Sequence, residues 1–198
     1  METSQYLKRL VPLFNKIYFT SKEARDIGVP SVALCYYQKI GRIKRIRHGL
    51  YQSSDYSTSI DFRWEDLIEE VYSVSGGVVC LISALAIYEL TDEIPRQHWI
   101  AVSNKTTAKV ESDVKIMRFR NMTLGRIEIS LDGVQIPIFD RERCIVDAFR
   151  LLSKEIAIKA LRAALSPSYG TKIDVVKLQN YAKKLRVNIN PYLIAVTT

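Results

Sequence analysis

The sequence has no hydrophobic run long enough to cross a bilayer. Its longest nearly apolar stretch, residues 78–88, already contains Ser83 and stops at Glu89, whereas a membrane-spanning helix needs about 18–20 apolar residues. The first ten residues, METSQYLKRL, carry an acid at position two and no apolar core, so they lack the pattern of a signal peptide. These absences predict a cytoplasmic protein without a membrane partner.

Cysteine and histidine are scarce. The three cysteines are far apart and odd in number, which does not suit a disulfide framework. Neither His48 nor His98 has a second histidine or a cysteine at the spacing that zinc ligands need. The sequence also contains no glycine-rich phosphate loop and no dinucleotide-binding fingerprint. We therefore expect no metal, no cofactor and no catalytic residues, and we predict that the protein is not an enzyme.

Positive charge is concentrated near the N-terminus. The 198 residues have a formal net charge of +8, and residues 1–60 hold ten basic and four acidic side chains. The segment RIKRIRH places four basic side chains in six positions without an acidic neighbour: Arg42, Lys44, Arg45 and Arg47. Such a cluster favours a polyanionic partner, because each neutralised phosphate releases a condensed counterion. A solvated basic hairpin is the alternative.

The pattern ahead of this cluster predicts three helices. Apolar residues recur at helical spacing over residues 4–16. The segment TSKE, residues 20–23, is a capping box that begins a second helix, and Gly28 is placed to end it. Ser31 is an N-cap candidate for a third helix over residues 31–40. Two short helices joined by a turn around a glycine form a helix-turn-helix.

Beyond the third helix the apolar period changes to two, which predicts a β-hairpin over residues 42–52 with its turn at His48-Gly49. A basic hairpin behind a helix-turn-helix is a wing, and the third helix would enter the major groove of DNA. We expect Leu34, Tyr37 and Ile40 to face the core. The candidate DNA contacts lie on the opposite side of the third helix and on the wing: Ser31, Val32, Tyr36, Gln38, Lys39, Arg42, Lys44, Arg45, Arg47 and His48. A protein-interaction module is the alternative.

The rest of the chain predicts a second region. Residues 53–59 are polar and indicate a linker, so the expected domains are residues 1–60 and 61–198. Helices are expected over 62–72, 78–90, 141–152, 156–165 and 175–186, and strands over 98–102, 114–119, 127–131 and 134–139. Asp140 suits the start of a helix, and Arg143 can pair with Asp147 four residues on. This order predicts the α+β class, with a winged helix-turn-helix followed by an α+β domain that has an antiparallel sheet.

Four segments together resemble one family: FTSKEARDIGVPSVAL, GRIKRIRHGLY, LISALAIYELTDEIPRQHWIAV and IFDRERCIVDAFR. They resemble the AbiEi family of transcriptional regulators, the antitoxins of AbiE abortive-infection toxin–antitoxin systems. The resemblance implies an N-terminal winged helix that represses its own operon at inverted repeats in double-stranded DNA. It also implies a C-terminal domain that counters a nucleotidyltransferase toxin in phage defence. We expect a monomer or weak dimer, with two copies on DNA, and a chain that stops short of the family's usual C-terminal extent.

A reading from another class stays open, namely a nuclease or DNA-modifying enzyme that the winged helix delivers to DNA. Asp113-Val114-Lys115 imitates part of a restriction-type nuclease site, although similar triplets occur elsewhere in the sequence. Cys144 with His98 does not form a recognisable catalytic pair. For an antitoxin, the basic side chains of the last helix are the candidate toxin-facing surface, with a plain solvated face as the alternative: Lys177, Lys183, Lys184 and Arg186.

Overall fold

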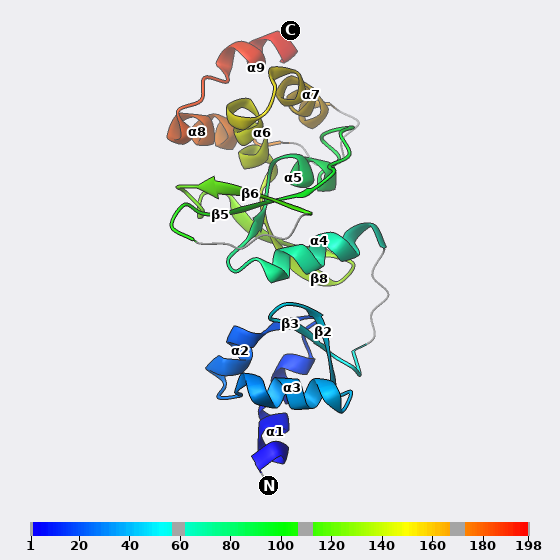
Figure 1. Cartoon of the computed structure of the whole chain (residues 1–198). Helices are drawn as coiled ribbons and strands as arrows, with labels where there is room; N and C mark the ends of the chain where they lie inside the picture. Colours follow the sequence, from blue (N-terminus) through cyan, green and yellow to red (C-terminus); the bar gives the residue numbers. More distant parts are fainter. Residues whose placement is uncertain (1, 57–61, 107–112, 167–172, 198) are drawn as a thin grey trace. The chain divides into compact units, whose positions relative to one another are not determined.

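The computed structural model describes residues 2–56, 62–106, 113–166 and 173–197, and Figure 1 shows their course. Contacts group the chain into two compact units, residues 1–75 with 130–134 and residues 76–129 with 135–198. Both contain helices and strands, which confirms the α+β class. The boundary between these compact units follows residue 75 and does not coincide with the predicted boundary at residue 60. The division into domains 1–60 and 61–198 therefore stays a prediction.

The first unit is a winged helix followed by one further helix. Its elements are α1 (Glu2–Phe14), β1 (Phe19–Thr20), α2 (Ser21–Asp26), α3 (Ser31–Lys39), β2 (Ile43–Arg47), β3 (Leu50–Ser53) and α4 (Phe62–Ser73). The three strands form a sheet in the order β1-β3-β2, and both pairings are antiparallel. The hairpin of β2 and β3 is the predicted wing. The predicted linker over residues 53–59 lies partly outside the described residues, and Ser53 belongs to β3 and is buried.

Local sequence explains how the two central helices begin. The capping box at α2 is confirmed: the Thr20 hydroxyl accepts a hydrogen bond from the Glu23 amide, and the Glu23 carboxylate accepts one from the Thr20 amide at 2.7 Å. The expected N-cap at Ser31 is wrong. Pro30 is the N-cap of α3 instead, because its carbonyl accepts the first amide hydrogen bonds of the helix and Ser31 is already helical.

The core of the winged helix gathers apolar side chains from α1 to β3. Leu10, Phe19, Leu34, Tyr37 and Ile43 belong to one buried cluster. The expectation that Leu34 and Tyr37 face the core is therefore confirmed. The same expectation for Ile40 is wrong, since this residue caps the C-terminus of α3 and half of its surface stays exposed.

The remaining elements form a second sheet with helices. They are β4 (Val78–Val79), α5 (Leu81–Ile87), β5 (His98–Ser103), β6 (Val114–Phe119), β7 (Arg126–Leu131), β8 (Val134–Phe139), α6 (Arg141–Leu151), α7 (Lys154–Leu165), α8 (Val175–Leu185) and α9 (Asn190–Thr197). The sheet order is β6-β5-β4-β8-β7. Helix α6 packs against α5, α7 and α8, and Figure 1 shows α6 to α9 gathered beyond one side of this sheet.

Two details of this region differ from expectation. The sheet is mixed: β4 pairs antiparallel with β5, but β5 with β6 and β4 with β8 are parallel. Among the strands of this sheet, only β7 and β8 are joined by a two-residue turn, and such a turn makes its two strands antiparallel. The other strands are joined by longer connections, so tertiary packing decides whether they run parallel or antiparallel. The helix expected over residues 78–90 is shorter, because Val78 and Val79 pair in the sheet and the helix begins at Leu81.

Candidate nucleic-acid interface

Helix α3 presents one face to the core and the other to solvent. Leu34 and Tyr37 are buried, whereas Val32 is 79% exposed and Tyr36 is 45% exposed. The predicted contacts of this helix all lie on the exposed side: Ser31, Val32, Tyr36, Gln38 and Lys39. This surface therefore offers an amide, an ammonium group, an aromatic ring and a methyl-bearing side chain, which are groups that read base edges in a major groove.

The wing carries exposed basic side chains next to this helix in the sequence. Arg42, Lys44, Arg45 and His48 are exposed, and no ion pair joins the first three to a carboxylate within the described residues. The Arg45 side chain lies 2.8 Å from Nδ1 of His48 and donates to the carbonyl of Arg47. The guanidinium at the tip of the wing is thus held in place without losing its charge.

Arg47 differs from the other basic side chains of the wing. Its guanidinium forms ion pairs with Glu69, at 3.2 Å, and with Glu70, at 2.7 Å, both on α4. The Tyr18 hydroxyl donates to the same Glu69, and burial together with this carboxylate raises the pKa of Tyr18, so the phenol keeps its proton. The charge of Arg47 is therefore matched within the first unit.

Sequence reasoning missed the acidic partners of Arg47. Helix α4 carries four acidic residues on its described part, among them Glu69 and Glu70, and Glu70 is only 1% exposed. A buried carboxylate needs a cation or several hydrogen bonds. Its partner lies 23 positions away in the sequence, so periodicity alone gives no signal for the pair.

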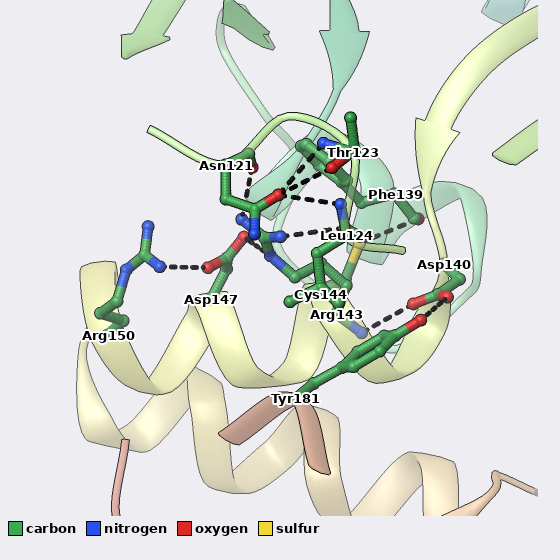
Figure 2. Close-up of polar contacts among 10 residues, drawn as sticks. All are labelled: Asn121, Thr123, Leu124, Phe139, Asp140, Arg143, Cys144, Asp147, Arg150 and Tyr181. Carbon is green, nitrogen blue, oxygen red and sulfur yellow. Dashed lines mark hydrogen bonds and ion pairs between the residues drawn. The ribbon is translucent and has the colours of Figure 1, made fainter. Parts of the chain in front are cut away.

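The second unit contains a buried arginine at its centre, which Figure 2 shows. The predicted pair is confirmed: Nε of Arg143 lies 2.7 Å from Oδ2 of Asp147, and both side chains are buried. The two terminal nitrogens of Arg143 donate to the carbonyls of Leu124 and Asn121, and the guanidinium lies over the ring of Phe139. Arg143 therefore fastens the segment between β6 and β7 to α6.

Asp140 connects the same centre to α8. It caps α6 as predicted, since its carboxylate accepts a hydrogen bond from the Arg143 amide at 2.9 Å. The other carboxylate oxygen accepts from the Tyr181 hydroxyl and pairs with Lys177 at 3.0 Å (Figure 2 shows Tyr181). Lys177 also pairs with Glu142, so this candidate for the toxin-facing surface holds two helices together.

Two of the side chains considered for catalysis, Lys115 and Cys144, make contacts that stabilise the fold. The Lys115 ammonium lies 3.8 Å from the ring centre of Trp99, which is a cation–π contact. Cys144 is fully buried and its thiol donates to the carbonyl of Phe139. Burial raises the pKa of Cys144, so the thiolate that a nucleophile needs is disfavoured. Across the ranges that the structure describes, no cluster of three histidine, cysteine or acidic residues could hold a metal ion.

A helix that crosses a bilayer needs about 18–20 mostly apolar residues. Of the helices in the described segments, none is long and apolar enough to cross a membrane.

Comparison with known proteins gives a family match for part of the chain and a likeness of fold. Residues 8–54 match the family model described as transcriptional regulator, AbiEi antitoxin. This stretch runs from the middle of α1 to the end of the wing, and it confirms the resemblance for the first two of the four segments, FTSKEARDIGVPSVAL and GRIKRIRHGLY. Comparison with the curated proteins gives no match. The crystal structure of the Rv2827c protein from Mycobacterium tuberculosis is similar, with a TM-score of 0.51 and 13% identity over 90% of this chain and 71% of that chain. At this identity the likeness concerns the fold.

Proposed function

We propose a function from the match of residues 8–54 to the family model of AbiEi antitoxin transcriptional regulators. The protein binds double-stranded DNA at an inverted repeat upstream of its own gene and represses its operon. It also counters a nucleotidyltransferase-type toxin from the same operon. The observation that carries the DNA-binding part is the exposed set Arg42, Lys44 and Arg45 on the wing, which forms no ion pair with a carboxylate among the described residues, beside an exposed helix α3.

Each part of this surface has a distinct task in the proposal. Arg42, Lys44 and Arg45 contact phosphates, because they are exposed and have no carboxylate partner among the described side chains. Gln38 and Lys39 read base edges from α3, since they lie on its solvent side. Arg47 is left out of the phosphate contacts because Glu69 and Glu70 already match its charge. Two copies of the chain then occupy the two halves of the repeat.

The test is a gel-shift titration of the full chain on the upstream repeat at several salt concentrations. The logarithm of the affinity should fall by about 0.9 per logarithm of salt for each phosphate neutralised. Replacing Lys44 and Arg45 together by alanine should lower this slope by about 2 and weaken binding to all sequences alike. Gln38→Ala should instead lower the preference for the repeat, at a cost of about 1–3 kcal/mol.

The matched control is Lys159→Ala, which removes an exposed charge from α7. It should leave both the salt slope and the preference for the repeat unchanged. A double wing variant with the same salt slope as the wild type would contradict the assignment of the wing to phosphates. Equal loss of affinity for the repeat and for random DNA in Gln38→Ala would contradict base reading by α3.

The antitoxin part is tested separately, by co-expression with the toxin encoded next to it. The wing variant of Lys44 and Arg45 should lose repression of an operon reporter and still rescue growth when it is made from a foreign promoter. This expectation rests on the second unit, which has its own buried core. Loss of rescue together with repression, at an unchanged protein level, would show that the two tasks share one surface.

We infer that the chain acts without catalysis, because the matching family is regulatory. Supercoiled and linear DNA should stay uncut over hours in Mg²⁺ or Mn²⁺. Cleavage that Asp113→Asn or Lys115→Ala abolishes would instead establish the nuclease reading.

A further inference from the structure

A basic pocket lies in the second unit, away from the winged helix in the sequence. It has a volume of about 380 Å³, and its lining includes Phe149, Arg150, Lys154, Arg186, Asn188 and Tyr192. This volume falls in the range of about 300–1,000 Å³ that small-molecule sites occupy. Three basic residues, from the ends of α6 and α8 and the start of α7, line this one hollow.

Of the three basic residues that line this pocket, only Arg150 forms an ion pair with an acid among the described residues. Asp147 is shared: its Oδ2 atom pairs with Arg143, and its Oδ1 atom pairs with Arg150 at 3.2 Å, as Figure 2 shows. Lys154 donates to the carbonyl of Phe149, and no ion pair gives it or Arg186 a carboxylate within the parts of the chain described. Three like charges around one hollow repel each other, so a bound anion would relieve this repulsion.

Arg186 adds an independent observation. It is the C-cap residue of α8 and adopts the left-handed conformation, with φ 58° and ψ 42°. Glycine is the usual residue at such a position, because a side chain there costs conformational energy. Here the residue in this strained conformation is an arginine, and it lines the pocket. Strain of this kind is typical of functional positions.

The aromatic wall of the pocket is already occupied. The rings of Phe149 and Tyr192 lie 4.7 Å apart between centres, and the Lys154 ammonium sits 5.5 Å from each of them. A planar base would have to displace this ammonium in order to stack. The recognition is therefore directed at an anionic group and not at a flat ring.

We propose that this pocket binds a small phosphate-bearing anion. Its cations come from three separate helix ends, and the tetrahedral phosphate group can accept hydrogen bonds from several directions at once, whereas a carboxylate accepts them in one plane. In this proposal Arg150 and Arg186 contribute guanidinium groups, Lys154 contributes a point charge, and Asn188, which also lines the pocket, contributes an amide. This site is separate from the surface proposed for DNA and does not depend on that proposal.

The experiment is calorimetric titration of the full chain with inorganic pyrophosphate at constant ionic strength, with citrate as a second anion. Pyrophosphate should bind saturably at one site, and citrate should bind at least tenfold more weakly. Lys154→Ala and Arg186→Gly should each weaken pyrophosphate binding by roughly tenfold or more, because a charge-assisted hydrogen bond is lost. Lys159→Ala, on the same helix as Lys154 but outside the pocket lining, should stay within about twofold of the wild type.

Arg186→Gly also separates binding from folding. Glycine adopts the left-handed conformation without strain, so the Tm of this variant should be equal to or higher than that of the wild type while binding is lost. Absence of saturable pyrophosphate binding, or equal binding by wild type and Arg186→Gly, would overturn the proposal. Citrate binding as tight as that of pyrophosphate would overturn the phosphate class. If the wild type does not bind pyrophosphate and Lys154→Ala or Arg186→Gly lowers its affinity for DNA, these cations bind nucleic acid. That result would overturn the small-anion site.

Discussion

Replacing Arg143 by methionine tests whether the buried arginine centre holds the second unit together. The side chain has no exposed surface, and its removal leaves the buried Asp147 with Arg150 as its one ion-pair partner among the described residues. Breaking a buried pair by removing one partner costs about 3–5 kcal/mol. Since Arg150 still compensates part of the charge, we expect the lower end of this range, about 3 kcal/mol.

Removing the carboxylate as well should restore part of the loss. In the double variant Arg143→Met with Asp147→Leu, no charge stays buried and uncompensated, and apolar replacements of buried pairs are often tolerated. The coupling energy between the two substitutions should therefore be about 2–3 kcal/mol. The exposed Arg126 on β7 offers a matched control, and Arg126→Met should change stability by less than about 0.5 kcal/mol.

The assay is urea unfolding followed by tryptophan fluorescence. The chain has two tryptophans, and a Trp64→Phe background leaves Trp99 on β5 as the reporter of the second unit. Additive losses in the double variant would refute the reasoning, because they would mean that Arg143 and Asp147 contribute independently. A loss below about 1 kcal/mol for Arg143→Met alone would refute it too.

The stability that Arg143→Met loses should depend on pH in a defined direction. Burial raises the pKa of Asp147, and Arg143 acts against this rise. Without Arg143 the pKa of the folded state rises further above the unfolded value, so the folded protein binds the proton more strongly. Stability is then retained below the unfolded pKa and lost as pH increases through the folded pKa. Arg143→Met should accordingly be less destabilised at pH 5 than at pH 7, measured by the same unfolding curves.

Three further substitutions test local contacts. Thr20→Ala removes the confirmed capping box and should cost about 1 kcal/mol in urea unfolding, whereas a serine at this position should restore most of it. Gly125→Ala should lower the Tm measurably, because the added Cβ would lie 2.8 Å from Cβ of Arg143. The backbone φ of +69° at this position also disfavours a residue with a side chain. An unchanged Tm would contradict this contact. Arg47→Gln removes an ion-pair partner of the buried Glu70 and should destabilise the first unit by about 2 kcal/mol while leaving the salt slope of DNA binding unchanged; a reduced slope would return Arg47 to the phosphate contacts.

Most of the winged helix could be predicted from the sequence because its signals are local. The capping box at residues 20–23, the helical spacing that buries Leu34 and Tyr37, and the alternating basic hairpin each involve neighbours within a few positions. The pair of Arg143 with Asp147 was predictable for the same reason, since side chains four apart on a helix lie on one face. The charge and identity of the candidate DNA contacts were also determined by the sequence alone.

Only the tertiary structure decided how distant parts of each unit use these residues. It places Glu69 and Glu70 against Arg47, although nothing in the local pattern of the wing distinguishes this arginine from Lys44 or Arg45. It also decides that β5 and β6 run parallel, because the long connection between them permits either direction. The basic pocket arises in the same way: Arg150 and Lys154 are four positions apart, but Arg186 follows 32 positions after Lys154, and only packing brings it to the same hollow.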